Sequence, residues 1–228
     1  MTHTDPLIHD AAYAFAFRTM QPQPEAPTRL LVLLHGVGGD ETQLAALGAR
    51  VDAETLVVLP RGQRSISGGM LGWYRVGLGA DGPQIVEAEA EEARTKLIEF
   101  VAQLQDRFDV QAGNTVLAGF SQGGILAASA ALTAPERVSA FAVLCGRLLP
   151  EIEPRLGDPA QLRTLQALIV HGREDETLPL EWAERAARWL ERLEVAHRVS
   201  VHDAGHELTP PMEQAFVEWL TRLDRAPA

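Results

Sequence analysis

A serine stands between two glycines in the segment Gly119–Gly123, which has the pattern G-x-S-x-G. The segment directly follows the apolar run Thr115–Ala118 and directly precedes an Ala-rich run. In such a turn from strand to helix the serine hydroxyl is lifted clear of the sheet, and bulky neighbours would collide with the adjoining backbone. We therefore predict that Ser121 is a nucleophile. The competing interpretation is a glycine-rich turn in which the serine is incidental.

A serine hydroxyl is a weak nucleophile until a base, most often a histidine, takes its proton. The histidines that follow Ser121 are His171, His197, His202 and His206. His206 lies in a loop between the last predicted strand and the last predicted helix, from which it can reach Ser121. His171 precedes the predicted acidic loop, and His197 and His202 flank or lie in the last strand. His206 is therefore the predicted base, with His202 as the second candidate.

The third partner of such a serine is a carboxylate that fixes the tautomer of the histidine and stabilises the imidazolium. When the nucleophile lies in a G-x-S-x-G turn, the acid lies between it and the histidine in the chain. The segment Val170–Pro179 follows an apolar run at that position and contains three acids, Glu174, Asp175 and Glu176. Spacing alone does not choose among the three.

Stabilising the oxyanion of a tetrahedral intermediate requires two backbone N–H donors. One is predicted to be Gln122, at the N-terminus of the helix that follows the serine. The other is predicted to be Val37, in the loop His35–Gly39 after the first buried strand, where glycines let the backbone turn its N–H groups inward. His35 is interpreted as a structural histidine that shapes this loop rather than as a catalytic group.

The elements that must position these residues follow an alternating pattern. Short apolar runs, typical of strands buried on both faces of a parallel sheet, occur at Leu30–Leu34, Thr55–Leu59, Thr115–Ala118, Ala140–Leu144 and Leu165–Val170, with a more polar run at Arg198–Val201 and an edge strand at Tyr13–Arg18. Helical spacing of apolar residues occurs at Glu87–Phe108, Gln122–Thr133, Glu181–Leu193 and Met212–Leu223. This alternation predicts an α/β fold, in which residues 1–228 form one domain with a mostly parallel central sheet and helices on both faces. Function is then expected at the carboxyl ends of the strands.

Composition excludes several classes of partner. The 228 residues carry a formal net charge of -11, which argues against binding to nucleic acid or to anionic membranes. No run approaches the ~18 apolar residues of a membrane span, and Met1–Asp10 lacks the features of a secretory signal, so a cytoplasmic location is expected. The single cysteine, Cys145, allows neither an internal disulfide nor a cysteine metal site and is interpreted as a small buried residue.

Taken together, these segments resemble the phospholipase/carboxylesterase family of α/β-hydrolases, which includes the acyl-protein thioesterases. The matching pieces are Leu34–Glu41, Pro60–Gly62, Trp73–Tyr74, Leu117–Gly124, His171–Asp175 with Leu178–Pro179, and Gly205–Glu207. The resemblance implies hydrolysis of carboxylic esters without a cofactor or metal. It also implies that Asp175 is the acid and His206 the base, with Val37 and Gln122 as the oxyanion donors.

The sequence departs from the family at one position. The family usually has an acidic residue after the Trp-Tyr pair, whereas Arg75 stands there, so the ion pairing of the Gly-rich segment Arg61–Asp81 is left open. This segment is predicted to line the acyl site, and the predicted substrate contacts are Met70, Leu71, Trp73 and Leu178. The alternative is a surface loop with one anchoring tryptophan. No insertion is large enough for a separate lid domain, so an open site is expected.

The predicted activity is hydrolysis of a small-molecule ester, or of a thioester, through an acyl-enzyme on Ser121. One alternative is an acyltransferase or perhydrolase, in which the same three residues pass the acyl group to an alcohol, an amine or a peroxide. A second alternative is a binding module on an inactive hydrolase scaffold, which the presence of all three residues disfavours. Dienelactone-type hydrolases are disfavoured because they use cysteine where Ser121 stands. Both a monomer and a homodimer are compatible with the sequence.

Overall fold

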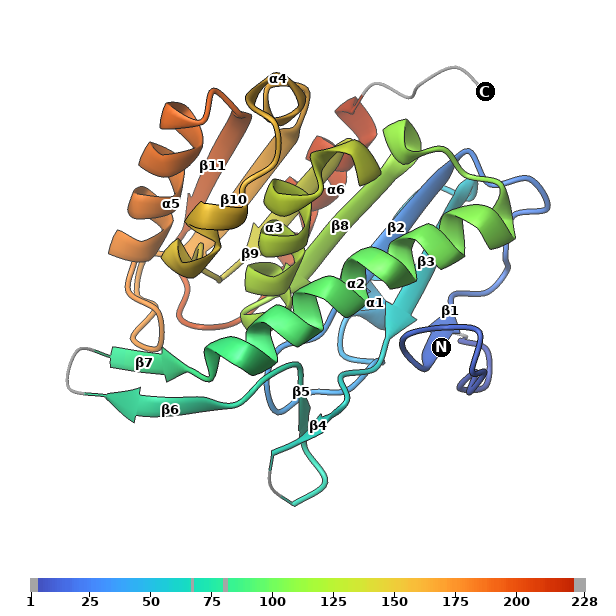
Figure 1. Cartoon of the computed structure of the whole chain (residues 1–228), viewed down its shortest axis with the longest axis horizontal. Helices are drawn as coiled ribbons and strands as arrows, with labels where there is room; N and C mark the ends of the chain where they lie inside the picture. The colour runs from blue at the N-terminus through green and yellow to red at the C-terminus, as the bar shows by residue number, and fades with distance from the viewer. Residues whose placement is uncertain (1–3, 67, 80–81, 224–228) are drawn as a thin grey trace.

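The structure is a computed structural model that describes residues 4–66, 68–79 and 82–223. The predictions for Ser67, Ala80, Asp81 and the two chain ends therefore lie outside the described residues. A seven-stranded sheet with the order β1-β3-β2-β8-β9-β10-β11 forms the centre of the molecule (Figure 1). Its strands are β1 Phe17–Thr19, β2 Arg29–Leu34, β3 Thr55–Pro60, β8 Thr115–Phe120, β9 Ala140–Leu144, β10 Gln166–Gly172 and β11 Ala196–His202. All neighbours pair in parallel except β1, which runs antiparallel to β3 at the edge.

Helices cover both faces of this sheet (Figure 1). They are α1 Ala45–Gly48, α2 Glu87–Phe108, α3 Gln122–Thr133, α4 Pro159–Leu162, α5 Glu181–Arg192 and α6 Pro210–Arg222, with short 3-10 turns at Ala112–Asn114, Pro135–Arg137 and Pro150–Arg155. Side chains of α2, α3 and α5 contribute to one buried apolar cluster, and those of α1 and α6 contribute to a second. The predicted α/β fold with a mostly parallel, doubly covered sheet is confirmed.

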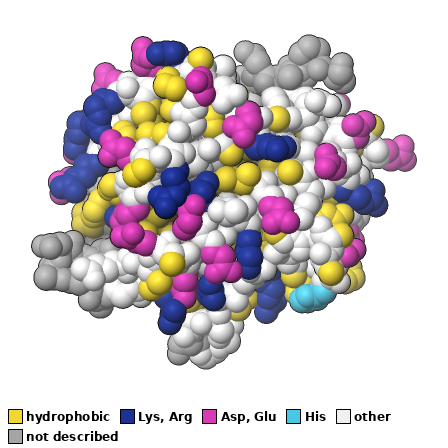
Figure 2. All heavy atoms as spheres, in the orientation of Figure 1, with side chains coloured by type: hydrophobic (Ala, Val, Ile, Leu, Met, Phe, Trp, Pro, Cys, Tyr) yellow, Lys and Arg dark blue, Asp and Glu magenta, His cyan; other side chains and the backbone are white. Residues whose placement is uncertain are grey.

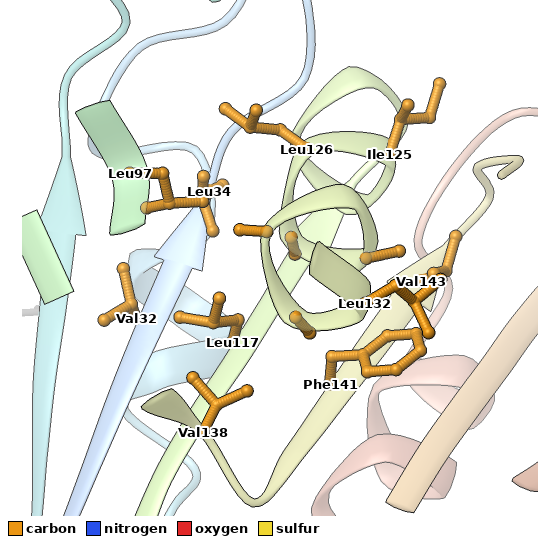
Figure 3. Packing of buried hydrophobic residues seen from close by; sticks show 14 of the residues in the cluster. Val32, Leu34, Leu97, Leu117, Ile125, Leu126, Leu132, Val138, Phe141 and Val143 are labelled. Carbon is orange, nitrogen blue, oxygen red and sulfur yellow. The ribbon is translucent and has the colours of Figure 1, made fainter. Parts of the chain in front are cut away.

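The apolar runs form strands because both faces of the sheet are buried. In β2, Leu30, Val32 and Leu34 lie in the first cluster, whereas Leu31 and Leu33 lie in the second. Successive side chains of a strand point to opposite faces, so an unbroken apolar run is what two covered faces require. Figure 3 shows the result on one face, where α3 lies across β2, β8 and β9 with its apolar side chains packed against theirs.

Small elements within and directly after the Gly-rich segment Arg61–Asp81 were not predicted from sequence. Two antiparallel pairs lie apart from the main sheet, and they are β4 Arg64–Ser65 with β5 Leu71–Gly72 and β6 Val76–Gly79 with β7 Gly82–Ile85. The predicted edge strand Tyr13–Arg18 is instead the three-residue β1, shifted towards the C-terminus. Tyr13 lies before the strand, with its ring against those of Phe17 and Phe100. Pairs and strands this short are too brief to produce a periodic pattern.

The charged side chains are spread over the surface in Figure 2, where basic and acidic groups are interspersed. Many form ion pairs, such as Arg94 with Glu91 and Arg185 with Glu181. Among the residues that the structure describes, no helix is both long enough and apolar enough to cross a membrane.

Candidate active site

Ser121 occupies the turn between β8 and α3, in a backbone conformation that is rare outside glycine. Its φ is +51° and its ψ is −117°, and its N–H donates to the carbonyl oxygen of Leu144 at 2.8 Å. Such a strained conformation persists only where the surroundings fix it. The flanking glycines are required because a Cβ on Gly119 would meet the backbone of Gly123, and one on Gly123 would meet the carbonyl oxygen of Leu34.

Three loops at the carboxyl edge of the sheet bring the predicted nucleophile, base and acid together. His206 lies between the other two, with Nε2 2.9 Å from Ser121 Oγ and Nδ1 2.7 Å from Asp175 Oδ2. A carboxylate accepts only, so the Nδ1–H donates to Asp175 and Nε2 is left to accept the proton of the Ser121 hydroxyl. Ser121 is 8% exposed and Asp175 is 4% exposed, so both groups are largely shielded from water.

The structure distinguishes Asp175 from its acidic neighbours. Its Oδ1 accepts hydrogen bonds from the amides of Thr177 at 2.9 Å and Leu178 at 2.8 Å, which leaves Oδ2 for His206. Glu174 and Glu176 are exposed on the same loop. Of the three candidate acids, only Asp175 is buried against the histidine.

A second histidine, which sequence reasoning set aside as a base, supports this loop from behind. His171 is fully buried, its Nε2 is 2.7 Å from the carbonyl oxygen of Leu178, and the same nitrogen is 3.5 Å from Asp175 Oδ2. Nε2 therefore carries the proton and donates to that carbonyl. His202, the second candidate base, is instead 2.8 Å from Ser200 Oγ through its Nε2. His197 contacts the carbonyl oxygen of Val195.

We expect Asp175→Asn to lower kcat by about 10⁴-fold, because an amide no longer fixes the reactive tautomer of His206. Glu174→Gln and Glu176→Gln are matched controls on the same loop and should keep the parental rate. Steady-state kinetics on one activated ester, with circular dichroism to check folding, measures all three variants. A large loss of kcat in either glutamate variant, with only a small loss in Asp175→Asn, would show that Asp175 is not the acid.

The loop after β2 uses most of its amides within the protein. The amide of Gly36 donates to Gln43 Oε1 at 2.7 Å, that of Gly38 to the carbonyl oxygen of Leu71 at 2.7 Å, and that of Gly39 to the carbonyl oxygen of Gly36 at 3.2 Å. Within the described residues, no acceptor is found for the amide of Val37. The same holds for the amide of Gln122, at the first position of α3. The two predicted oxyanion donors are thus both left free for a ligand.

His35 holds this loop against the segment that follows β3. Its Nδ1 is 2.7 Å from the carbonyl oxygen of Gly36, and its Nε2 accepts a hydrogen bond from the amide of Gly62 at 2.9 Å. The indole of Trp73 donates to the His35 carbonyl oxygen at 2.8 Å, and the two rings lie 4.9 Å apart. These contacts fit the structural role predicted for His35, and its burial lowers the pKa of its imidazole.

The neutral form of His35 makes stability depend on pH. The pKa of His35 in the folded protein lies below the ordinary value of about 6.5. As the pH falls, His35 is therefore protonated in the unfolded chain at a higher pH than in the folded protein. The stabilisation is complete above about pH 6.5 and is lost as the pH falls below it towards the folded pKa. We expect the free energy of unfolding in urea to fall as the pH is lowered below about 6.5. The fall should be smaller for His35→Gln, whose side chain at this position cannot titrate. An equal loss in both proteins would contradict this.

The segment that carries the predicted substrate contacts is tied to the nucleophile turn. The side chain of Gln122 accepts from the amide of Trp73 and donates to the carbonyl oxygen of Tyr74, each at 2.8 Å. Trp73 is only 2% exposed and belongs to the core, as the anchoring tryptophan of the alternative interpretation would. Met70 is 45% exposed, beside the loop of Val37, and Leu71 is partly buried. Leu178, the fourth predicted contact, is a buried residue of the loop that carries Asp175, and its amide donates to Asp175 Oδ1.

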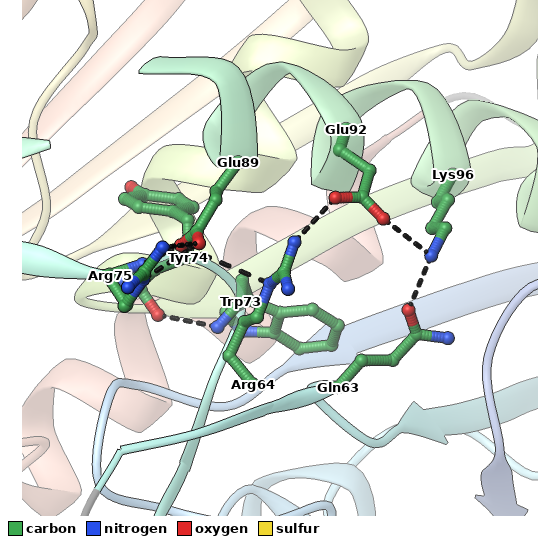
Figure 4. Close-up of polar contacts among 9 residues, drawn as sticks. Gln63, Arg64, Trp73, Tyr74, Arg75, Glu89, Glu92 and Lys96 are labelled. Carbon is green, nitrogen blue, oxygen red and sulfur yellow. Dashed lines mark hydrogen bonds and ion pairs between the residues drawn. The ribbon is translucent and has the colours of Figure 1, made fainter. Parts of the chain in front are cut away.

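Arg75, the residue that departs from the family pattern, forms an ion pair with Glu89 on α2 (Figure 4). Its amide and Nε donate to the two carboxylate oxygens of Glu89, each at 2.8 Å, and these bonds lower the pKa of Glu89. Nearby, Glu92 pairs with both Arg64 and Lys96. Sequence reasoning left the ion pairing of this segment open, and the only signal for the pairing was the acidic first turn of α2.

Other reactive groups near the site have structural roles. Burial raises the pKa of the Cys145 thiol to about 12, so the sulfur is protonated and donates to the carbonyl oxygen of Glu207 at 3.4 Å. Cys145 is fully buried, as predicted. In the described part of the chain, no group of three or more His, Cys, Asp and Glu side chains is arranged to hold a metal ion.

Comparison with known proteins identifies relatives along almost the whole chain. The model of the phospholipase/carboxylesterase family matches residues 17–223. A carboxylesterase from Mesorhizobium loti is 23% identical, with a TM-score of 0.81 over 95% of this chain and 98% of that one. The Bacillus cereus carboxylesterase is 22% identical, with a TM-score of 0.80 over 92% and 95%. The MhqD protein of Bacillus subtilis (strain 168) is 25% identical over 192 residues, which are 83% of this chain and 91% of that protein.

Proposed function

The chain belongs to the phospholipase/carboxylesterase family and is a carboxylic ester hydrolase, and from this premise we propose that Ser121, His206 and Asp175 carry out the hydrolysis. The observation that carries the proposal is the position of His206, which is hydrogen-bonded to Ser121 through one ring nitrogen and to Asp175 through the other. We propose a small-molecule ester or thioester as the substrate.

Acylation begins when Ser121 Oγ attacks the carbonyl carbon and its proton passes to His206 Nε2. Asp175 stabilises the imidazolium so formed, through the hydrogen bond at Nδ1. The negative charge on the former carbonyl oxygen is stabilised by the amides of Val37 and Gln122, which bind it more strongly than the neutral carbonyl. The intermediate then collapses, the bond to the leaving oxygen or sulfur breaks, and His206 Nε2 protonates that atom. An acyl group remains on Ser121.

Deacylation repeats these steps with water as the nucleophile. His206 Nε2 takes a proton from the water as the oxygen attacks the acyl carbon, and the same two amides stabilise the second oxyanion. Collapse releases the carboxylic acid and returns the proton to Ser121 Oγ. We propose that Met70 and Leu71 contact the acyl part, since the loop of Val37 is hydrogen-bonded to Leu71. Trp73 and Leu178 then act from the core, by holding the loops that these contacts require.

Hydrolysis of a series of esters and matching thioesters, with acyl chains of increasing length, tests this function. We expect release of one equivalent of acid and one of alcohol or thiol, with the same acyl preference in both series because both pass through one acyl-enzyme. Adding a competing alcohol, amine or peroxide measures the partition of that acyl-enzyme. Acyl products in preference to free acid would indicate an acyltransferase or perhydrolase. Absence of any turnover by the folded protein would favour the binding module.

A further inference from the structure

A cavity of about 310 Å³ opens beside the imidazole of His206, between the loop that follows β2 and the start of α6. Its apolar lining comes from Leu44, Leu47, Phe120 and Leu208. The Phe120 ring lies 5.1 Å from the His206 ring, so this lining continues directly onto the predicted base. Such a volume is at the lower end of the roughly 300–1,000 Å³ typical of small-molecule sites.

The position of this cavity identifies the part of the substrate that it would take. In the proposed mechanism, His206 Nε2 must reach the leaving oxygen or sulfur in order to protonate it. The oxyanion amides of Val37 and Gln122 bind the carbonyl oxygen instead. The group attached to the leaving atom therefore lies on the His206 side, and the cavity that includes His206 is in position to receive it.

The charged groups around this cavity leave a net negative charge. Two carboxylates line it, those of Glu207 and Glu213. Glu213 is 2.7 Å from Arg50 and is neutralised by it, whereas Glu207 is exposed and forms no ion pair within the described residues. One uncompensated negative charge thus lies one residue from the predicted base. It would repel an anionic leaving group and attract a cationic one.

We propose that this cavity is the leaving-group subsite, and that Glu207 makes the enzyme select small esters or thioesters whose alcohol or thiol part is neutral or cationic with an apolar body. Phosphorylated and other anionic leaving groups are disfavoured. This proposal rests on the proposed function, because it assigns a specificity to the same site.

Three aryl esters that share the same acyl group and differ only in the phenol test the charge selection. Their phenol rings carry a trimethylammonium group, its neutral isostere tert-butyl, or a sulfonate. We expect Glu207→Gln to lower the ratio of kcat/KM for the cationic over the anionic ester by about fivefold or more, which corresponds to about 1 kcal/mol. The effect should shrink at high ionic strength. Intrinsic differences among the phenols cancel, because each ratio is compared between enzymes that act on the same esters.

Glu191→Gln is the matched control, since Glu191 is an exposed carboxylate on α5, away from the cavity. It should leave the ratio unchanged. If Glu207→Gln also leaves the ratio unchanged while the neutral ester is hydrolysed at the parental rate, the proposed selection is wrong. If the parental enzyme does not hydrolyse even the neutral ester, the proposed function itself fails, and the two failures are therefore distinguishable.

Leu208→Phe tests the location of the leaving group independently of charge. The larger side chain should lower kcat/KM for the tert-butylphenyl ester by about tenfold relative to the methyl ester of the same acid, because it fills space that the phenol ring would otherwise occupy. This change corresponds to about 1.4 kcal/mol. The methyl ester serves as the internal control for folding and catalysis. An equal loss on both esters, or no loss on either, would place the leaving group elsewhere.

Discussion

Ser121→Ala should reduce kcat by about 10⁶-fold while the protein stays folded, because the hydroxyl is the group that becomes acylated. Alanine accepts the same backbone conformation as serine, so the turn at φ +51° is not made more strained by the substitution. Ser129→Ala is a matched control on the following helix. Its hydroxyl is also buried, but it donates to the carbonyl oxygen of Ile125 at 2.8 Å and should be dispensable for turnover.

Steady-state kinetics and urea unfolding on the three proteins measure this prediction. The residual rate of Ser121→Ala should remain about 10³- to 10⁴-fold above the rate in water, owing to the oxyanion amides and substrate binding. Parental turnover by Ser121→Ala would remove the serine from the mechanism. If Ser129→Ala lost turnover while it stayed folded, removal of any buried hydroxyl near α3 would be enough to stop turnover. The loss in Ser121→Ala would then not identify the nucleophile.

His206→Ala should be nearly as inactive as Ser121→Ala, because the hydroxyl loses the group that takes its proton. The double variant should be no slower than either single variant, since residues that act as a unit lose their effect together. His202→Ala is the control, because its imidazole contacts Ser200 in the last strand and has no contact with Ser121. It should keep a rate within about threefold of the parent, a loss of less than 1 kcal/mol.

The opposite pattern would reverse the assignment of the base. If His202→Ala were inactive and His206→Ala active, the hydrogen bond of 2.9 Å between His206 and Ser121 would have no catalytic meaning. Adding imidazole to His206→Ala provides a further check, because a small base that enters the vacated space should restore part of the rate.

Much of the fold was predictable because its strands are buried on both faces. The run Leu30–Leu34 predicted β2, and Gln122–Thr133 predicted α3, whose bounds the structure reproduces. Apolar runs of this kind are determined locally, by the need to fill two core layers. The position of Ser121 was predictable for the same reason, since a Gly-rich turn between a strand and a helix is a local pattern.

The choice of Asp175 over Glu174 and Glu176 was not available from spacing. All three lie in one turn, and what separates them is the hydrogen bonding of the folded loop. The pairing of Arg75 with Glu89 depends on a contact between a loop and a helix, which no periodic pattern records. Likewise, Trp73 is buried in the core and donates to the carbonyl oxygen of His35, a residue 38 positions away in the chain, and contacts between such distant residues leave no local pattern.

The most direct test of the account is the intact mass of the protein after treatment with a fluorophosphonate, which phosphonylates activated serines. We expect one adduct on the parent protein, no adduct on Ser121→Ala, and much slower labelling of His206→Ala, while Ser129→Ala labels at the parental rate. An unlabelled but folded parent protein would mean that Ser121 is not activated. An adduct that persists in Ser121→Ala would place the reactive serine elsewhere, and either result would contradict the proposed mechanism.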